Sequence, residues 1–324
     1  MKWVKLFFVA AIALGCILFG QHPGHTIVSA FAHSPTTQPL PLDQYTGVVL
    51  LEPVHCSGTL LKGKQFVLTA AHCLNKGDPI PDKEITVVFR REPRNLKARV
   101  ARYFIHPSWK GKLAVEGYDL ALLELDAVVP DFIEAYDIYR DQDEIGKVFT
   151  KVGYGYIGLG STGEDRTSNS DLNRHWGQNR YEALLDIFIP VTDGDLSTVV
   201  PRSQLMYDFD DGTPTRDAFG RYFPRLADLG LGKNEAGSGA GDSGGPCFID
   251  GKVAAVTSWG FSDRGFFMIT DSVDIDDEIS NGSFGEFFSD TRVSFYAPWI
   301  DMVMNHRRNI DPRDAKSAPT LTLD

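Results

Sequence analysis

The chain has 324 residues, of which 43% are hydrophobic and 23% charged, and its net charge is -11. This composition is that of an ordinary globular protein, and the length allows one or two domains with a large core. The excess of acidic residues gives no electrostatic support for nucleic-acid binding, so we expect no nucleic-acid partner.

The N-terminal segment has the pattern of a signal peptide. Two lysines precede an apolar run from Leu6 to Phe19, which is short for a membrane span. Because Ala30-Phe31-Ala32 is a small-x-small cleavage site, we expect a signal peptide at 1–32 and a mature chain that begins at His33. An uncleaved N-terminal anchor and a lipoprotein modified at Cys16 are the alternatives.

Short runs with strand character follow, separated by polar turns and without a long helical period. A first set covers Tyr45–Leu51, Ser57–Leu61, Gln65–Thr69, Glu84–Phe89, Ala98–Ile105 and Asp119–Leu125. A second set covers Gly146–Gly155, Ala183–Pro190, Ser203–Tyr207 and Lys252–Gly260, and Thr291–Ile300 follows as a last strand that passes into a helix. This spacing is typical of antiparallel barrels.

Three motifs carry residues with catalytic potential. Ser243 lies within Gly239–Pro246, where glycines on both sides allow a sharp bend. His72 follows a hydrophobic strand, and Asp119 begins another apolar run. Near neutral pH a histidine can take the proton of a serine hydroxyl during attack, and a carboxylate can orient that histidine.

The order His72, Asp119, Ser243, in these contexts, resembles the trypsin/chymotrypsin family of secreted serine proteases. The resemblance implies an all-β fold of two antiparallel six-stranded β-barrels of the chymotrypsin type with a C-terminal helix, here running to about His306. We therefore expect a protease domain at 33–308 and a disordered tail at 309–324. The barrels would cover about 45–135 and about 145–298.

The resemblance also implies roles for individual residues. His72, Asp119 and Ser243 would form the catalytic triad, and the backbone N–H groups of Gly241 and Ser243 would form the oxyanion hole. Three residues match the segment that pairs with the substrate backbone: Ser258, Trp259 and Gly260.

Gly237 and Ser238 match the base of the pocket that receives the side chain before the cut bond. Because neither carries a charge, we expect a preference for an apolar side chain there. Gly265 and Phe288 are candidates for the opposite wall, and Asp271 could fold back to create a cation site.

Activation by a new N-terminus is a known device of the resembled family. Its relatives pair the amine of an Ile-Val-Gly-Gly start with the aspartate before the serine, here Asp242. The nearest match in this chain, Ile27–Ala30, falls inside the expected signal peptide, so the partner of Asp242 stays open.

Four cysteines are present: Cys16, Cys56, Cys73 and Cys247. The resemblance implies a disulfide between Cys56 and Cys73, which is plausible for an exported chain, and leaves Cys247 as a buried small hydrophobe. A zinc site that combines Cys56 and Cys73 with His55 and His72 is the competing hypothesis, although the spacing is not that of known zinc motifs.

Polar insertions lengthen the second half, at 158–178, 208–235 and between Gly260 and Thr291. They contain acidic clusters such as Asp208-Phe209-Asp210-Asp211-Gly212, which could bind calcium. Because no complete ligand loop of the EF-hand kind is present, we favour solvated acidic loops and expect no metal and no cofactor.

Together these features predict a secreted serine endopeptidase, extracellular or periplasmic, that acts on polypeptides through an acyl-enzyme intermediate. We expect a monomer without stable membrane association after signal cleavage. The alternative is a non-catalytic binding protein with the same fold and an occluded cleft. Acylation of Ser243 by an active-site serine reagent distinguishes the two.

Overall fold

The computed structural model describes residues 27–111, 114–167, 173–191, 198–267, 270–276, 278–306 and 321–323. Most of the expected signal peptide and most of the expected tail lie outside these residues. The described part contains the helices α1 (Ala218–Tyr222), α2 (Asp263–Phe267) and α3 (Val293–His306). Short 3-10 helices are η1 (Pro35–Thr37), η2 (Ala71–Cys73), η3 (Asp82–Glu84), η4 (Ala114–Glu116), η5 (Leu185–Val191), η6 (Pro224–Leu226) and η7 (Gly232–Asn234). None of the helices so described is both long and apolar enough to span a bilayer.

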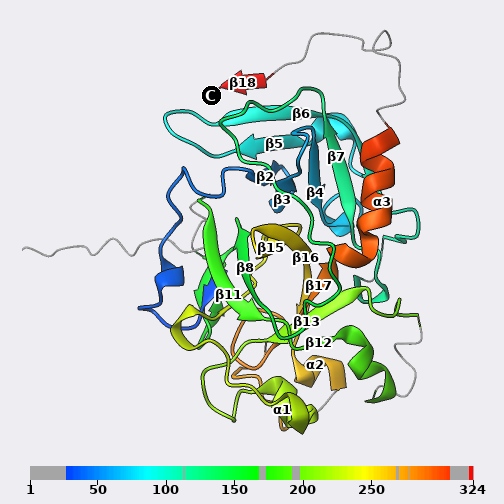
Figure 1. Ribbon diagram of the computed structural model, residues 1–324. Helices are drawn as coiled ribbons and strands as arrows, with labels where there is room; N and C mark the ends of the chain where they lie inside the picture. The colour runs from blue at the N-terminus through cyan, green and yellow to red at the C-terminus, as the bar shows by residue number, and fades with distance from the viewer. Residues whose placement is uncertain are drawn as a thin grey trace, which may run out of the picture.

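Six strands of the first half form a closed antiparallel barrel (Figure 1). They are β2 (Val48–Glu52), β3 (Cys56–Leu60), β4 (Phe66–Thr69), β5 (Thr86–Phe89), β6 (Leu96–Ile105) and β7 (Ala121–Leu125). The order is β6-β5-β2-β3-β4-β7, and the barrel closes because β6 also pairs with β7. The strand register places Leu60, Val67 and Leu123 on one face of this sheet, and all three are fully buried in the core of the barrel.

The sheet of the first barrel extends by one C-terminal strand. β18 (Leu321–Leu323) pairs antiparallel with residues 96–98 of β6. The expectation of a disordered tail is therefore wrong for these three residues. The physical reason is that an edge of β6 presents unpaired backbone groups, onto which a short strand can add.

The strands of the second half form a seven-stranded sheet in the order β11-β8-β15-β16-β17-β13-β12. They are β8 (Val148–Gly153), β11 (His175–Arg180), β12 (Ala183–Leu184), β13 (Gln204–Asp208), β15 (Pro246–Ile249), β16 (Lys252–Phe261) and β17 (Phe287–Arg292). The predicted chymotrypsin-type fold is confirmed, but this second barrel stays open, because its two edge strands, β11 and β12, do not pair with each other.

A small sheet brings the N-terminal end of the described chain into the second half. Its order is β10 (Gly163–Glu164), β9 (Ile157–Leu159), β1 (Ile27–Ser29) and β14 (Ala236–Gly237). Ile27 and Val28 are 0% exposed, and Ala30 is also buried. The residues that the structure describes thus include a buried strand at Ile27–Ser29, ahead of the expected domain start at His33.

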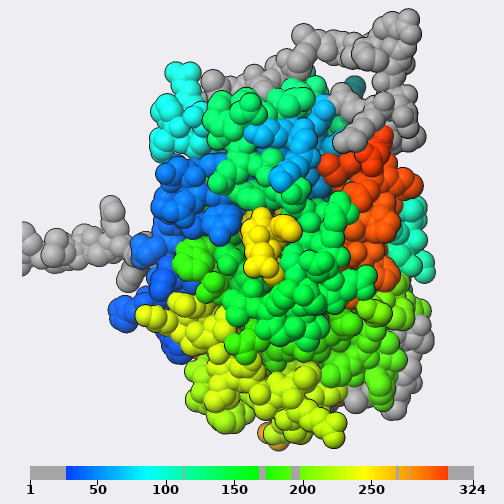
Figure 2. Space-filling view, in the orientation of Figure 1, coloured from blue at the N-terminus to red at the C-terminus, as the bar shows by residue number. Residues whose placement is uncertain are grey.

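The C-terminal helix covers the first barrel. In Figure 1, α3 (orange-red) lies beside β7, and Figure 2 shows it along one flank of the molecule. Its buried residues Val293, Tyr296, Ile300 and Val303 recur at helical spacing and join the core of the first barrel. The prediction of a last strand followed by a helix to His306 is confirmed.

Candidate active site

His72 lies in η2, directly after β4 of the first barrel. The disulfide between Cys56 and Cys73 ties this turn to β3, with an S–S distance of 2.05 Å. The predicted disulfide is confirmed. Because both sulfurs are used in this bond, neither is available as a zinc thiolate, and the zinc hypothesis is wrong.

Asp119 holds His72 by two hydrogen bonds. The ring Nδ1 of His72 lies 2.7 Å from Asp119 Oδ2, and the backbone N of His72 donates to Oδ1 over 2.8 Å. Ser258 Oγ donates to the same Oδ2 over 2.5 Å. Burial by itself raises the pKa of Asp119, but the neighbouring His72 and the hydrogen bonds from His72 and Ser258 bring that pKa below its usual value. Asp119 is thus an anion that orients the imidazole.

Ser243 lies in the turn before β15, so it comes from the second half of the chain and meets residues of the first barrel. Its carbonyl accepts from the backbone N of Ser57 over 2.8 Å. Gly244 has a φ of +83°, and a Cβ there would lie 2.1 Å from Thr69 Oγ1 and 2.3 Å from Ser57 O. Glycine is therefore required for this bend, as the sequence predicts.

The turn that carries Ser243 also presents two backbone N–H groups that can donate hydrogen bonds. Gly241 has a φ of +103°, which a side chain would make unfavourable. In the part of the chain that the structure describes, the N–H groups of Gly241 and Ser243 donate to no other protein group. Both are consequently available to a negatively charged oxygen.

Asp242, between them, points away into the interior. Its two oxygens accept from the backbone N of Gly155 and of Gly239, each over 2.9 Å. Burial raises the pKa of Asp242 to about 6. These two amides are the partners that the sequence left open.

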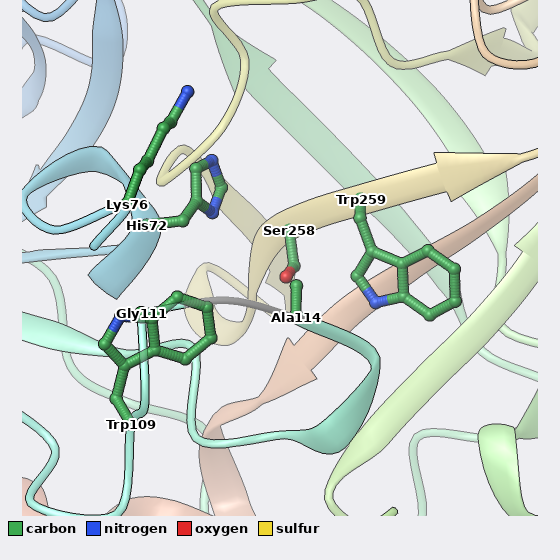
Figure 3. A pocket seen from close by; sticks show the side chains of 7 residues that line it. All are labelled: His72, Lys76, Trp109, Gly111, Ala114, Ser258 and Trp259. Atoms are coloured by element: carbon green, nitrogen blue, oxygen red, sulfur yellow. The ribbon is translucent and has the colours of Figure 1, made fainter. Parts of the chain in front are cut away.

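Two hollows flank the candidate site and share Ser258 and Trp259. The first, with a volume of about 250 Å³, contains His72 in its wall. Figure 3 shows Trp109 and Trp259 on opposite sides of it, with His72 and Ser258 between them. The second, of about 310 Å³, contains Ser243 in its wall. The site is therefore open on both sides of the Ser258–Trp259 segment.

The expected substrate-contacting residues do not all lie in this second hollow. Ser238, Ser258, Trp259 and Gly260 line it, together with Phe288. Gly237 does not belong to its wall, because the aromatic rings of Phe209 and Phe288 lie 2.9 Å and 3.2 Å from where its Cβ would be.

The other candidates for this wall lie elsewhere. Gly265, in α2, faces Ile279 instead, at 2.6 Å from where a Cβ would be. Asp271 is exposed and pairs with Arg221 over 2.7 Å, so it creates no cation site in the hollow.

A buried ion pair below Ser238 escaped the sequence analysis. Lys151 Nζ donates to Ser238 Oγ over 2.6 Å and lies 3.3 Å from Asp290 Oδ1. The side chains of Lys151 and Asp290 are only 2% and 1% exposed. Asp290 also accepts from Tyr181 and from Cys247. A lysine within the strand run of β8 and an aspartate within that of β17 were the signal that could have revealed the pair.

The acidic insertion also differs from its expected solvated state. Asp208 and Asp210 are 1% and 2% exposed, because Asp208 ends β13, which lies between β17 and β12, and the chain continues inward through Phe209. The expectation of a solvated acidic loop is wrong for these two residues.

Comparisons with known proteins agree with this architecture. A family model described as Trypsin matches residues 38–180. Kallikrein 1-related peptidase b24 of Mus musculus is 25% identical over 276 residues, which cover 80% of this chain and 88% of the relative. A trypsin of Saccharopolyspora erythraea is 26% identical over 210 residues, or 63% of this chain and 75% of the relative. Mouse neuropsin, a solved serine protease structure, aligns with a TM-score of 0.56 at 17% identity, over 82% of this chain and 97% of its own.

Proposed function

Since the chain belongs to the trypsin/chymotrypsin family of serine proteases, we propose that it is a secreted endopeptidase that hydrolyses peptide bonds through His72, Asp119 and Ser243. The observation that carries the proposal is the doubly hydrogen-bonded pair of His72 and Asp119 beside the glycine-rich turn of Ser243. The disulfide between Cys56 and Cys73 supports export to an oxidising compartment.

In this mechanism Ser243 Oγ attacks the carbonyl carbon of the substrate while His72 Nε2 takes its proton. His72 then gives this proton to the leaving amine, and the acyl-enzyme is hydrolysed by water in the same way. Asp119 fixes the tautomer with hydrogen on Nδ1 and stabilises the imidazolium.

The negative oxygen of the tetrahedral intermediate lies against the N–H groups of Gly241 and Ser243. Each such donor contributes about 3 kcal/mol to transition-state stabilisation. The positive φ of Gly241 supports this role, since a residue without a side chain adopts it readily and leaves its N–H open to approach.

The substrate backbone pairs with Ser258–Gly260, and its side chain before the cut bond enters the hollow of about 310 Å³. We propose an apolar preference there. Phe288 supplies an apolar wall, and Lys151 already neutralises the carboxylate of Asp290. Asp290 is therefore not free to pair with a lysine or arginine side chain of the substrate.

Maturation before Ile27 fits the structure better than cleavage after Ala32. Cleavage after Ala32 would remove β1 from between β9 and β14 and expose their paired edges. A chain that starts at Ile27 keeps β1 and carries a free amine at a residue whose backbone N lies 3.2 Å from Tyr156 O. In relatives such an amine pairs with the aspartate before the serine, which here is Asp242.

The alternative, a binding protein with an occluded cleft, receives less support. The acidic insertions leave hollows next to both His72 and Ser243. The test is hydrolysis of a mixed peptide library by the purified wild type and by Ser243→Ala. We expect internal cuts by the wild type and a loss of about 10⁵–10⁶-fold in the variant. Equal rates for both would overturn the proposed mechanism.

A further inference from the structure

Three aspartates meet where β13 ends and α1 begins. Asp208 is the last residue of β13, Asp210 follows it, and Asp217 precedes α1. One carboxylate oxygen from each lies within 4.8 Å of the other two. Asp217 is 4% exposed, so all three are buried. In Figure 1 this region lies at the end of the molecule away from the first barrel.

Two oxygens of this cluster have no partner. Oδ1 of Asp208 and Oδ1 of Asp210 are fully buried and accept no hydrogen bond from any described residue. The second oxygen of Asp208 accepts from Phe219 N over 2.7 Å, and Asp217 accepts from Gly220 N. Amides therefore hold two of the three carboxylates in place, while oxygens of the cluster are left unsatisfied.

The surroundings add negative charge and no compensating cation. Glu182 Oε1 accepts from the backbone N of Asp208 over 3.4 Å, its carboxyl also faces that of Asp208, and no N–H or hydroxyl group of the described residues donates to its buried Oε2. Among the described residues, no lysine or arginine forms an ion pair with Asp208, Asp210 or Asp217. Buried carboxylates without a cation are strongly unfavourable unless a proton or a metal ion neutralises them.

We propose that Asp208, Asp210 and Asp217 together bind one Ca²⁺ ion. Carboxylate oxygens are hard ligands, and oxygens bound to one Ca²⁺ at about 2.3–2.6 Å lie at the mutual separations found here. Mg²⁺ gives up its water reluctantly, so a buried set of carboxylates suits Ca²⁺ better. Water molecules, and Glu182 through its unpartnered oxygen, can complete the coordination.

Bound Ca²⁺ would join β13 to the segment before α1. The neighbour of Asp208, Tyr207, stacks on Phe288 with ring centroids 5.2 Å apart, and Phe288 lines the hollow beside Ser243. The ion therefore stabilises the strand that supports this wall. Its binding does not depend on the catalytic role of Ser243.

The test uses the full chain with Ser243→Ala, so that self-digestion cannot influence the result. After treatment with EDTA, CaCl2 is titrated by calorimetry and the thermal unfolding is followed with CaCl2, with MgCl2 and with EDTA. We expect one Ca²⁺ per chain and a Tm higher by about 5 °C at a hundredfold excess over Kd. MgCl2 at the same concentration should give a smaller shift.

Asp210→Asn provides the decisive comparison, with Asp211→Asn as its matched control. Asp211 is the next acid in the chain and accepts from Thr213, a bond that asparagine preserves. Asp210→Asn should weaken Ca²⁺ binding at least tenfold, yet be no less stable than the parent in EDTA, because it removes a buried charge. Asp211→Asn should bind as the parent does.

Several results would overturn the proposal. One is the absence of both binding heat and a Tm shift with CaCl2. The others are a Tm shift with MgCl2 equal to that with CaCl2, and an equal loss of Ca²⁺ affinity in Asp210→Asn and Asp211→Asn. If Asp210→Asn does not fold in EDTA, its role is structural and the proposal is wrong for Asp210. Asp217→Asn then tests the cluster by the same measurements.

Discussion

The carboxylate of Asp119 accepts hydrogen bonds from the ring Nδ1 and from the backbone N of His72, over 2.7 Å and 2.8 Å respectively. One oxygen thus controls the orientation of the imidazole, and the other fixes the backbone that carries it. Ser258, from the second half of the chain, donates to the first of these oxygens. The orientation of His72 therefore depends on both halves of the fold.

Asp119→Asn should lower kcat by about 10⁴-fold, because an amide cannot hold the imidazole in the tautomer that accepts the proton of Ser243. Peptide hydrolysis at neutral pH measures this. Asp137→Asn, at an exposed aspartate that pairs with Lys62, is the control and should retain wild-type turnover. A loss of less than tenfold in Asp119→Asn, with the fold intact by circular dichroism, would argue against the triad.

Cys247 should be inert to thiol reagents in the folded protein. It is fully buried, and burial together with Asp290 raises its pKa, so little thiolate forms. Labelling with iodoacetamide, followed by peptide mapping, should modify Cys247 only after unfolding. The same map without reduction should show Cys56 joined to Cys73. Rapid labelling of Cys247 in the native protein would contradict its burial.

Lys151→Met should destabilise the fold by about 3–5 kcal/mol, because Asp290 is left as a buried unpaired charge. The double variant Lys151→Met/Asp290→Asn should recover most of this loss. Denaturant unfolding of these two variants and of Asp290→Asn measures the coupling. If the double variant is as unstable as the sum of its single changes, the two residues do not act as a pair.

The same ion pair bears on specificity. Wild-type enzyme should cut a mixed peptide library mainly after apolar residues. Lys151→Met should gain cleavage after lysine or arginine relative to the wild type, because the Asp290 carboxylate beneath Ser238 loses its cation. Dominant cutting after lysine or arginine by the wild type would refute the apolar preference.

Asp242 should make the unprocessed chain less stable as the pH rises. Its pKa is about 6 in the fold, above its ordinary value of 3.8, so the folded state binds more protons between these values. The free energy of unfolding should therefore fall by up to about 3 kcal/mol from pH 4 to pH 7, relative to Asp242→Asn. If a chain that starts at Ile27 pairs its amine with Asp242, the pKa of Asp242 falls below 3.8, and this loss of stability between pH 4 and pH 7 should disappear. Identical slopes for both chains would exclude that pairing.

Much of this structure is determined by residues that lie close together in the sequence. The bend at Ser243 requires glycine at Gly244, and the short apolar runs that form β4 and β7 place His72 just after one strand and Asp119 just before the other. These features depend on neighbours in the chain, and they were predictable. The disulfide followed from a resemblance, because spacing alone cannot fix cysteine pairing.

The rest depends on contacts between distant segments. Lys151 and Asp290 lie 139 residues apart in the chain, and only the strand order brings them together. Asp208 and Asp210 look like part of a polar loop, but their burial is set by the strand pairing of β13 with β17. The sequence at Ile27 and Val28 fits both the end of a signal peptide and a buried strand. Only their pairing with β9 and β14 shows that they form a strand.

Covalent labelling of Ser243 tests the central claim most directly. The purified protein is incubated with a fluorophosphonate at neutral pH, and the adduct is located by peptide mass mapping. We predict one adduct per chain, on Ser243, formed far more slowly in His72→Ala and absent in Ser243→Ala. An intact, folded protein that takes up no reagent at Ser243, or that reacts equally fast without His72, would contradict the account.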